Sequence, residues 1–303
     1  ASTQLYAFNA TAGERFFFDA RSVTNGQANW RLFAPNGAQV FQTNAVSDTD
    51  VIRVDQTGEY LLAVEGRIYN ATAGTTNVTF NVQRVADDTA ALALGARVEG
   101  DIAHAGQIDR YTFTLGARTS VLVDSLSNSP FNWTLSGPTG VIASRDFRSS
   151  DSRDFGGTPA LDLLAGQYTL SIDPSGDTTG AYAFRVLDLA AAASFVAPTA
   201  GTPTSVGGTL DPAAGTAMHR FDAVAGDRFF FDFVSATNTD TQWRLLNPYG
   251  DIVFDRAFNS DAPEVALGIT GTYTLLIEGR YFQTANNAYA FNVEFRGNTP
   301  PVP

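Results

Sequence analysis

Residues 10–19 read Ala-Thr-Ala-Gly-Glu-Arg-Phe-Phe-Phe-Asp, and residues 223–232 read Ala-Val-Ala-Gly-Asp-Arg-Phe-Phe-Phe-Asp. Two stretches that agree this closely, so far apart in the chain, indicate an array of repeated units. A third and more divergent copy lies between them. Arrays usually serve reach, scaffolding or multivalent binding, because chemistry needs a single site whereas length needs repetition.

Four landmarks occur in the same order in every copy. The first two are a lone tryptophan and the Pro-x-Gly turn that follows it, at Trp30, Trp133 and Trp243. The third is a Gly-x-Tyr phrase, at Tyr60, Tyr168 and Tyr273. The last is a closing run of alternating apolar residues, at 78–84, 182–188 and 289–295. This agreement defines three repeats.

The local pattern within a repeat predicts β-strands. Alternate residues are large and apolar over short runs rich in Val, Phe, Tyr and Thr, and Gly, Pro, Asn and Asp separate the runs. We expect an all-β protein of three tandem antiparallel β-sandwich domains, beads on a string, with six to eight strands each. Each repeat is long enough to bury its own core. The predicted domains are residues 1–86, 87–190 and 191–303, and the last ends in a Pro-rich tail. We expect the landmark aromatic residues to form these cores rather than a stacking platform for sugars.

The first copy lacks an opening strand that the other two copies have. Residues 96–102 and 205–210 precede the phrases that correspond to residues 4–8, and only three residues precede that phrase in the first copy. We therefore expect an open sheet edge in the first repeat. Either the segment was cut from a longer protein, or another chain supplies the strand.

Composition narrows the classes of partner. The net charge of −12 makes nucleic acid and anionic membrane surfaces improbable partners, because both recognise basic patches. No run of apolar residues is long enough for membrane insertion. The chain has no cysteine, so neither disulfides nor thiolate chemistry stabilise it. An acidic, Gly/Thr/Asn-rich β-composition is typical of secreted bacterial surface proteins, so we expect an extracellular or cell-surface location.

The second repeat carries the phrases QIDRYTFTL (107–115), WTLSGPTG (133–140), AGQYTLSI (165–172) and GAYAFRV (180–186). In this order they resemble the bacterial pre-peptidase C-terminal domain, and the resemblance extends over residues 4–295. The resemblance implies small β-sandwiches of jelly-roll type, which are appended to secreted proteases and strung along large surface adhesins. The Asn-Trp phrase departs from the Asp-rich strand usual in that family. For this reason the calcium or collagen binding of its protease-linked members is not carried over to this chain.

Catalysis is not expected. The chain has two histidines, His104 and His219, and the first copy matches neither of them. A nucleophile elbow, a His-Glu-x-x-His helix and a phosphate-binding glycine-rich loop are all absent from the sequence. We therefore predict a protein that is not an enzyme and that needs no cofactor.

Calcium is the one metal that the acidic loops suggest. Ca²⁺ prefers several oxygen ligands on a flexible loop, and two loop regions in each repeat offer carboxylates. The candidate ligands are Asp19, Asp124 and Asp232 after the Phe-rich strand, and Asp48, Asp50, Asp151 and Asp261 before the Tyr strand. The alternative is that these residues make Asx-turns and keep the loops soluble.

A second group of candidate residues is shared by the first and third copies. Glu-Gly-Arg occurs at 65–67 and 278–280, whereas the second copy has Asp173-Pro174. Arg67 and Arg280 therefore mark either an inter-domain or inter-subunit contact, or a local ion pair of little energetic consequence. Beside them, the loop aromatics Tyr69, Tyr281 and Phe282 suggest contact with a partner or ligand.

These observations predict a non-catalytic, extracellular structural repeat protein, a subunit or segment of a bacterial surface fibre, layer or adhesin. Its partners are expected to be copies of itself, or further repeats of the same protein, joined head-to-tail by strand complementation of the first repeat. The alternative is a carbohydrate- or surface-binding module whose aromatics Tyr69, Tyr249, Tyr281 and Phe282 contact surface glycans. A third possibility is an accessory domain of a secreted protease.

Overall fold

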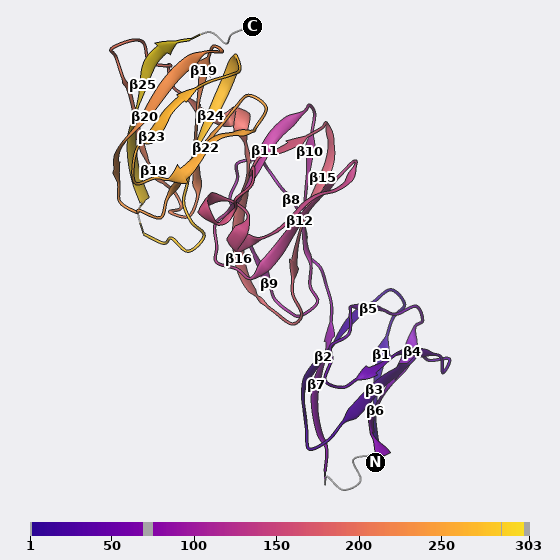
Figure 1. Ribbon diagram of the computed structural model, residues 1–303. Helices are drawn as coiled ribbons and strands as arrows, with labels where there is room; N and C mark the ends of the chain where they lie inside the picture. The colour runs from indigo at the N-terminus through magenta and orange to yellow at the C-terminus, as the bar shows by residue number, and fades with distance from the viewer. Residues whose placement is uncertain (1, 69–74, 286, 300–303) are drawn as a thin grey trace. The chain divides into compact units, whose positions relative to one another are not determined.

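The computed structural model describes residues 2–68, 75–285 and 287–299 (Figure 1). Within these ranges the chain forms β-strands and turns, with short 3₁₀ segments and no α-helix. None of the described helical segments is long and apolar enough to cross a membrane. The strands form six sheets, which pair into three sandwiches, so the predicted all-β fold of tandem antiparallel sandwiches is confirmed.

The first sandwich has a four-stranded sheet and a three-stranded sheet, seen as two layers in Figure 1. The four-stranded sheet contains, in spatial order, β1 (Thr3–Ala10), β6 (Gly58–Gly66), β3 (Ala28–Phe33) and β4 (Gln39–Asn44). The three-stranded sheet contains β5 (Ile52–Arg53), β2 (Arg15–Thr24) and β7 (Asn77–Arg84).

The second sandwich has five strands in one sheet and four in the other. The first sheet contains β13 (Gly140–Asp146), β12 (Phe131–Gly137), β15 (Gly166–Pro174), β10 (Asp109–Leu115) and β8 (Thr89–Ala91). The second sheet contains β14 (Leu161–Leu163), β11 (Thr119–Ser125), β16 (Gly180–Asp188) and β9 (Val98–Ile102). Three 3₁₀ segments flank these sheets: η2 (Phe147–Ser149), η3 (Ser152–Asp154) and η4 (Leu189–Ala191).

The third sandwich repeats the same plan. One sheet contains β17 (Ala193–Ser194), β19 (Thr216–Ala223), β24 (Gly271–Glu278), β21 (Gln242–Leu246) and β22 (Ile252–Ala257). The other contains β18 (Thr204–Leu210), β25 (Asn287–Asn298), β20 (Asp227–Ala236) and β23 (Ala262–Ala266).

The landmark residues occupy the cores, as predicted. Trp30, Trp133 and Trp243 are fully buried, and they lie on the corresponding strands β3, β12 and β21. In the first sandwich, Phe18 meets Trp30 edge-on at 6.2 Å between ring centroids, and in the third the corresponding Phe231 meets Trp243 at 6.5 Å. Each sandwich therefore buries its own aromatic core, which accounts for one tryptophan per repeat.

Grouped by the packing of the chain, the molecule has two compact units. The first unit comprises Ala1–Asp88, Asp101–Arg110 and Asp173–Gly180, and the second comprises Thr89–Gly100, Tyr111–Ile172 and Ala181–Pro303. The second unit thus holds the third sandwich and most of the second. These units are defined by which parts of the chain pack together, and their limits do not coincide with the repeats. The predicted domain boundaries after residues 86 and 190 therefore stay predictions.

Candidate functional site: an open sheet edge and a buried charged seam

The outer edge of the final strand is occupied in two repeats and open in the first. In the second and third sandwiches an opening strand occupies that edge, β9 beside β16 and β18 beside β25. In the first sandwich the sheet ends at β7, and no described residue pairs with its outer edge. An unpaired edge presents a row of free backbone donors and acceptors to any strand that can reach it.

The apolar face of β7 is correspondingly less covered. Val78, Phe80 and Val82 point toward the core, but each is only half-buried. Their counterparts in the other two sandwiches are all buried, namely Tyr182, Phe184 and Val186 in β16 and Tyr289, Phe291 and Val293 in β25. The first sandwich therefore exposes apolar surface that an edge strand covers in the others.

A groove of about 620 Å³ follows this open side of the first sandwich. It is lined by residues of β1 and its approach, such as Gln4 and Tyr6, and by residues 75–79 at the start of β7. Tyr6 is 47% exposed there, whereas Tyr111 in the same position of the second sandwich is 8% exposed. Tyr111 is covered because β9 passes over it, with Gly100 so close that a Cβ atom would lie 2.7 Å from the Tyr111 hydroxyl oxygen.

In the second unit, the second and third sandwiches share a buried seam. Leu122, Leu187 and Leu189 of the second sandwich form one apolar cluster with Leu246 and Leu276 of the third. All five leucines are at most 7% exposed. Burial of this apolar surface holds the two sandwiches together.

Charged groups surround that cluster, and Arg244 on β21 is the central one. Its side chain is fully buried, and it donates hydrogen bonds to the backbone oxygens of Ser152 and Phe155, each at 3.0 Å. Arg244 also approaches Glu278 Oε1 at 3.3 Å. The backbone N–H of Ser152 donates to that same oxygen at 3.1 Å, with Ser152 held at a φ of 52°. A left-handed non-glycine residue is an unfavourable conformation that the surrounding contacts must enforce.

Asp124 and Asp151 complete the seam from the second sandwich. Asp124 accepts hydrogen bonds from Arg185 Nε at 2.9 Å and from the Thr216 hydroxyl of the third sandwich at 2.8 Å. Asp151 Oδ2 accepts the backbone N–H of Ser125 at 2.6 Å. Both carboxyl groups are at most 4% exposed.

The seam buries more carboxyl groups than guanidinium groups. Three carboxyl side chains, Asp124, Asp151 and Glu278, face one fully buried guanidinium and the largely buried Arg185. Desolvation by burial raises the pKa of all three carboxyl groups above their ordinary values, and raises that of Glu278 to about 7. The Oε2 atom of Glu278 has no hydrogen-bond partner among the described residues.

The residues predicted to bind calcium come together in pairs across each sandwich. In every sandwich the later aspartate accepts the backbone N–H that follows the earlier one. Asp48 accepts Ala20 N–H at 2.7 Å, and Asp261 accepts Phe233 N–H at 2.9 Å, as Asp151 does with Ser125. The earlier aspartates contact basic or amide side chains, Asp19 with Arg21, Asp124 with Arg185 and Asp232 with Asn292.

These contacts give the aspartates a structural role in fastening a loop to a strand. Asp50 is exposed. The described ranges contain no group of three or more acidic, histidine or cysteine side chains arranged to hold a metal ion. Calcium binding stays a prediction, and a melting temperature unchanged between calcium and a chelator would count against it.

The predicted interface residues have different surroundings. Arg280 forms a two-pronged ion pair with Asp154 of the second sandwich, Nε to Oδ2 at 2.8 Å, and stacks over Phe282 at 4.7 Å. Arg67 is exposed and donates to the side chain of Gln27 at 2.8 Å. Tyr281 is half-buried and Phe282 is 41% exposed. Tyr69 lies outside the described residues.

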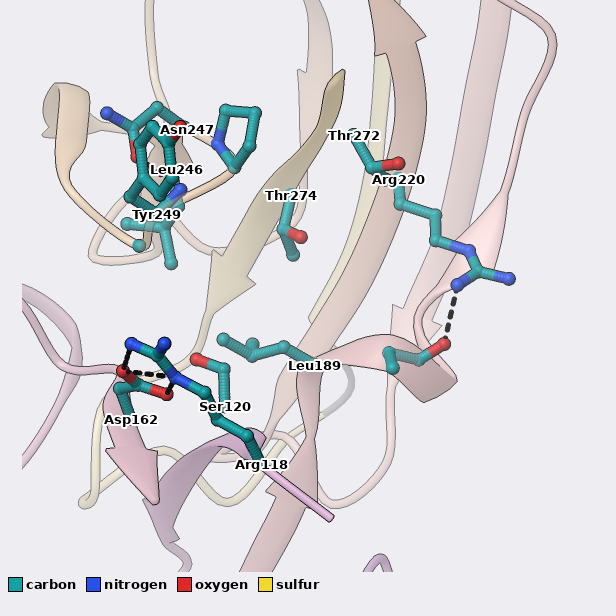
Figure 2. A pocket seen from close by; sticks show the side chains of 13 residues that line it. Arg118, Ser120, Asp162, Leu189, Arg220, Leu246, Asn247, Tyr249, Thr272 and Thr274 are labelled. Carbon is teal, nitrogen blue, oxygen red and sulfur yellow. Dashed lines mark hydrogen bonds and ion pairs between the residues drawn. The ribbon is translucent and has the colours of Figure 1, made fainter. Parts of the chain in front are cut away.

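A further groove, of about 500 Å³, runs along the seam (Figure 2). Figure 2 shows the paired Arg118 and Asp162 on one side and Tyr249 with Asn247 on the other. Tyr249 is 77% exposed. Hydroxyl groups of Thr272 and Thr274 on β24 also line the groove.

Similarity to known proteins is limited to the fold. No protein-family model and no curated protein matches the chain. Among solved structures, 35% of the chain aligns with all of the periplasmic g-type lysozyme inhibitor PliG of Aeromonas hydrophila, at 12% identity and a TM-score of 0.28. A similar share, 34%, aligns with 97% of the pre-peptidase C-terminal domain of a Bacillus anthracis collagenase, at 15% identity and a TM-score of 0.25. The CUB1-EGF-CUB2 fragment of human MASP-1/3 aligns over 67% of the chain and 94% of its own length, at 8% identity and a TM-score of 0.25.

Proposed function

We propose that this chain is a non-catalytic structural segment of an extracellular bacterial surface fibre, layer or adhesin. In this proposal the first sandwich is a joint, where a strand from a neighbouring subunit or repeat adds to the outer edge of β7. The open edge of β7, beside occupied edges at β16 and β25, is the observation that carries the proposal.

Strand addition follows from two properties of this edge. The added strand would satisfy the free backbone groups of β7, and its alternate side chains would cover Val78, Phe80 and Val82. The two opening strands of the chain itself show what such a strand looks like. They read Val98-x-Gly-x-Ile102 and Val206-x-Gly-x-Leu210, so one apolar residue stands at each end of a short extended segment.

Strand addition predicts that a peptide with the sequence of Thr204–Leu210 protects β7 in the full-length chain. At a peptide concentration about ten times its dissociation constant, backbone amides of residues 77–84 should exchange with solvent about tenfold more slowly. Hydrogen exchange measured by mass spectrometry reports this directly. The matched control is the same peptide with Val206→Asp and Leu210→Asp, which keeps the backbone but loses both apolar contacts. Equal protection by both peptides, or by neither, would remove strand addition from the proposal.

A second candidate function is binding of surface glycans, and the groove in Figure 2 is the observation that favours it. An exposed tyrosine beside hydroxyl, amide and guanidinium groups offers a stacking face together with hydrogen-bond donors, which is how proteins commonly hold sugars.

Glycan binding predicts a loss on Tyr249→Ala that Tyr6→Ala does not reproduce. Loss of one stacking contact is expected to weaken binding about tenfold in calorimetric titrations with a panel of neutral and acidic oligosaccharides. Tyr6 is the matched control because it is also an exposed tyrosine, at 47%, and lies outside this groove. A wild-type chain that binds none of the oligosaccharides would exclude this second function for the panel tested.

A further inference from the structure

Six positions of the third sandwich that contribute to its seam with the second lie on the outer face of one sheet or just after its strand β24. By strand register they have direct counterparts in the first sandwich, because β1, β3 and β6 pair there as β19, β21 and β24 pair in the third. The positions in the third sandwich are Thr216, Met218, Arg244, Leu246, Glu278 and Arg280. Their counterparts are Thr3, Leu5, Arg31, Phe33, Glu65 and Arg67, here called the docking face.

The two sets agree in chemical type at every position. Threonine, both arginines and the glutamate are identical, and the remaining two positions are apolar in both. The second repeat lacks this set, with Thr134 after its tryptophan where the others have arginine, and Asp173 followed by Pro174 where they have Glu-Gly. Agreement of six positions on an outer surface is not needed to form a core, since the second sandwich folds without them.

The same residues differ in burial between the two sandwiches. In the third, the side chains of Arg244 and Glu278 are completely buried against the second sandwich. In the first, Arg31 and Glu65 form the corresponding pair at 3.1 Å with side chains 30% and 32% exposed. Leu5 is 61% exposed. The docking face thus carries the contact residues of the seam in an uncovered state.

We infer that the docking face binds a β-sandwich of the second-repeat type, in the way the third sandwich binds the second. The partner is defined by the surface that receives the third sandwich, here called the receptor face. It consists of three leucines, Leu122, Leu187 and Leu189, the acceptor Asp124, and the acidic turn 151–155. This inference rests on the proposed assembly role and names the partner that the joint takes.

Three polar contacts of the seam have a corresponding group on the docking face. Thr3 would donate to the partner's aspartate as Thr216 donates to Asp124, and Arg67 would pair with an acidic turn as Arg280 pairs with Asp154. Arg31 would reach the carbonyl oxygens of that turn as Arg244 does. The two outward guanidinium groups complement the acidic turn in charge.

The receptor face and the opening strand come from consecutive parts of the chain. After the second sandwich the chain forms β18, which fills the edge beside β25 of the third sandwich before the chain reaches Thr216. A preceding repeat of the second type would therefore supply both the receptor face and the strand that the edge of β7 lacks.

The test is an extended chain in which residues 87–215 are repeated ahead of Thr3, so that Gly215 precedes Thr3 as it precedes Thr216. The chain has no cysteine, so a single thiol reports on the docking face. We expect Leu5→Cys to react with a maleimide about tenfold or more slowly in the extended chain than in the original one, because modification then requires local opening. Val46→Cys, at 64% exposure and away from the docking face, is the matched control and should react equally fast in both chains.

A second extended chain verifies that the added receptor face causes the protection. It carries arginine in place of the added copies of Leu122 and Leu189 only, and we expect it to restore fast labelling of the Leu5→Cys thiol. Hydrogen exchange of residues 77–84, measured in the same samples, reports on strand addition separately. Fast maleimide labelling of the Leu5→Cys thiol together with slow hydrogen exchange of residues 77–84 would overturn the docking inference and support strand addition. Fast labelling with fast exchange would overturn both, and slow labelling with fast exchange would support docking and remove strand addition.

Discussion

Replacing Arg244 by methionine is expected to lower the free energy of unfolding of the second unit by about 3–5 kcal/mol, because it leaves buried groups without their partner. The guanidinium donates to the carbonyl oxygens of Ser152 and Phe155 and faces Glu278, all inside the seam. Methionine fills a similar volume but can satisfy none of these acceptors. Chemical denaturation at pH 8, followed by tryptophan fluorescence, measures the loss.

The first sandwich supplies the matched control for this substitution. Arg31 occupies the same position of the repeat and pairs with Glu65, but both side chains are about one-third exposed. Surface ion pairs contribute little, so Arg31→Met is expected to cost under about 1 kcal/mol. Equal losses for the two substitutions would show that burial in the seam does not set the energy of the pair.

Acidification from pH 8 to pH 5 is expected to stabilise the second unit, with Glu278 as the main cause. Burial raises the pKa of Glu278 from 4.5 to about 7, against the attraction of Arg244 and aided by the negative charges of Asp255 and Asp124. Because the folded state holds the proton more tightly, this contribution to stability is fully present below about pH 4.5 and is lost as the pH rises through 7. The whole change is about 3 kcal/mol by the usual conversion.

Burial also raises the pKa values of Asp124 and Asp151, whereas it lowers the pKa of His219, which opposes the effect of Glu278 as the pH falls. Measuring the free energy of unfolding at intervals from pH 5 to pH 8 gives the slope. Glu278→Gln, which is neutral at every pH, should flatten the curve, and Glu65→Gln should leave it unchanged because Glu65 belongs to the first unit. A stability that rises with pH across this range would contradict the assignment of Glu278 as the proton-holding group.

The Glu-Gly-Arg phrase makes different contacts in the two copies that carry it. From the sequence, this phrase at 65–67 and 278–280 indicated either a contact between domains or a local ion pair. In the third sandwich it contributes to a contact between domains, through Arg280 with Asp154 and Glu278 with Ser152. In the first sandwich the structure shows local pairing, Glu65 with Arg31 and Arg67 with Gln27. The residues are the same, and the presence of a neighbouring sandwich makes the difference.

Periodicity and the repeated landmarks were sufficient to predict the fold. Alternation of apolar residues determines which face of a strand is buried, so Trp30, Tyr60 and their counterparts could be placed in a core from the sequence alone. Comparison of the copies also predicted the open edge of the first sandwich, and no described residue pairs with the outer edge of β7.

The sequence could not predict which donor groups the aspartates of the acidic loops contact. The sequence allows Asp48 and Asp19 to be calcium ligands or turn-making residues, and the structure shows Asp48 accepting a backbone N–H of the neighbouring strand and Asp19 in an ion pair with Arg21. Carboxylates in loops suit both roles, and the donors that they meet are set by which strands the loops lie against.

The sequence by itself determined the three sandwiches, their aromatic cores and the open edge of the first sandwich, because each of these follows from local periodicity and from comparison of copies. Only the tertiary structure decided that Arg244 and Glu278 are buried while Arg31 and Glu65 remain partly in water. Identical residues acquire different burial, and Glu278 a shifted pKa, because a second domain excludes solvent from one copy of the surface. That exclusion depends on how whole domains pack, which no local pattern of residues encodes.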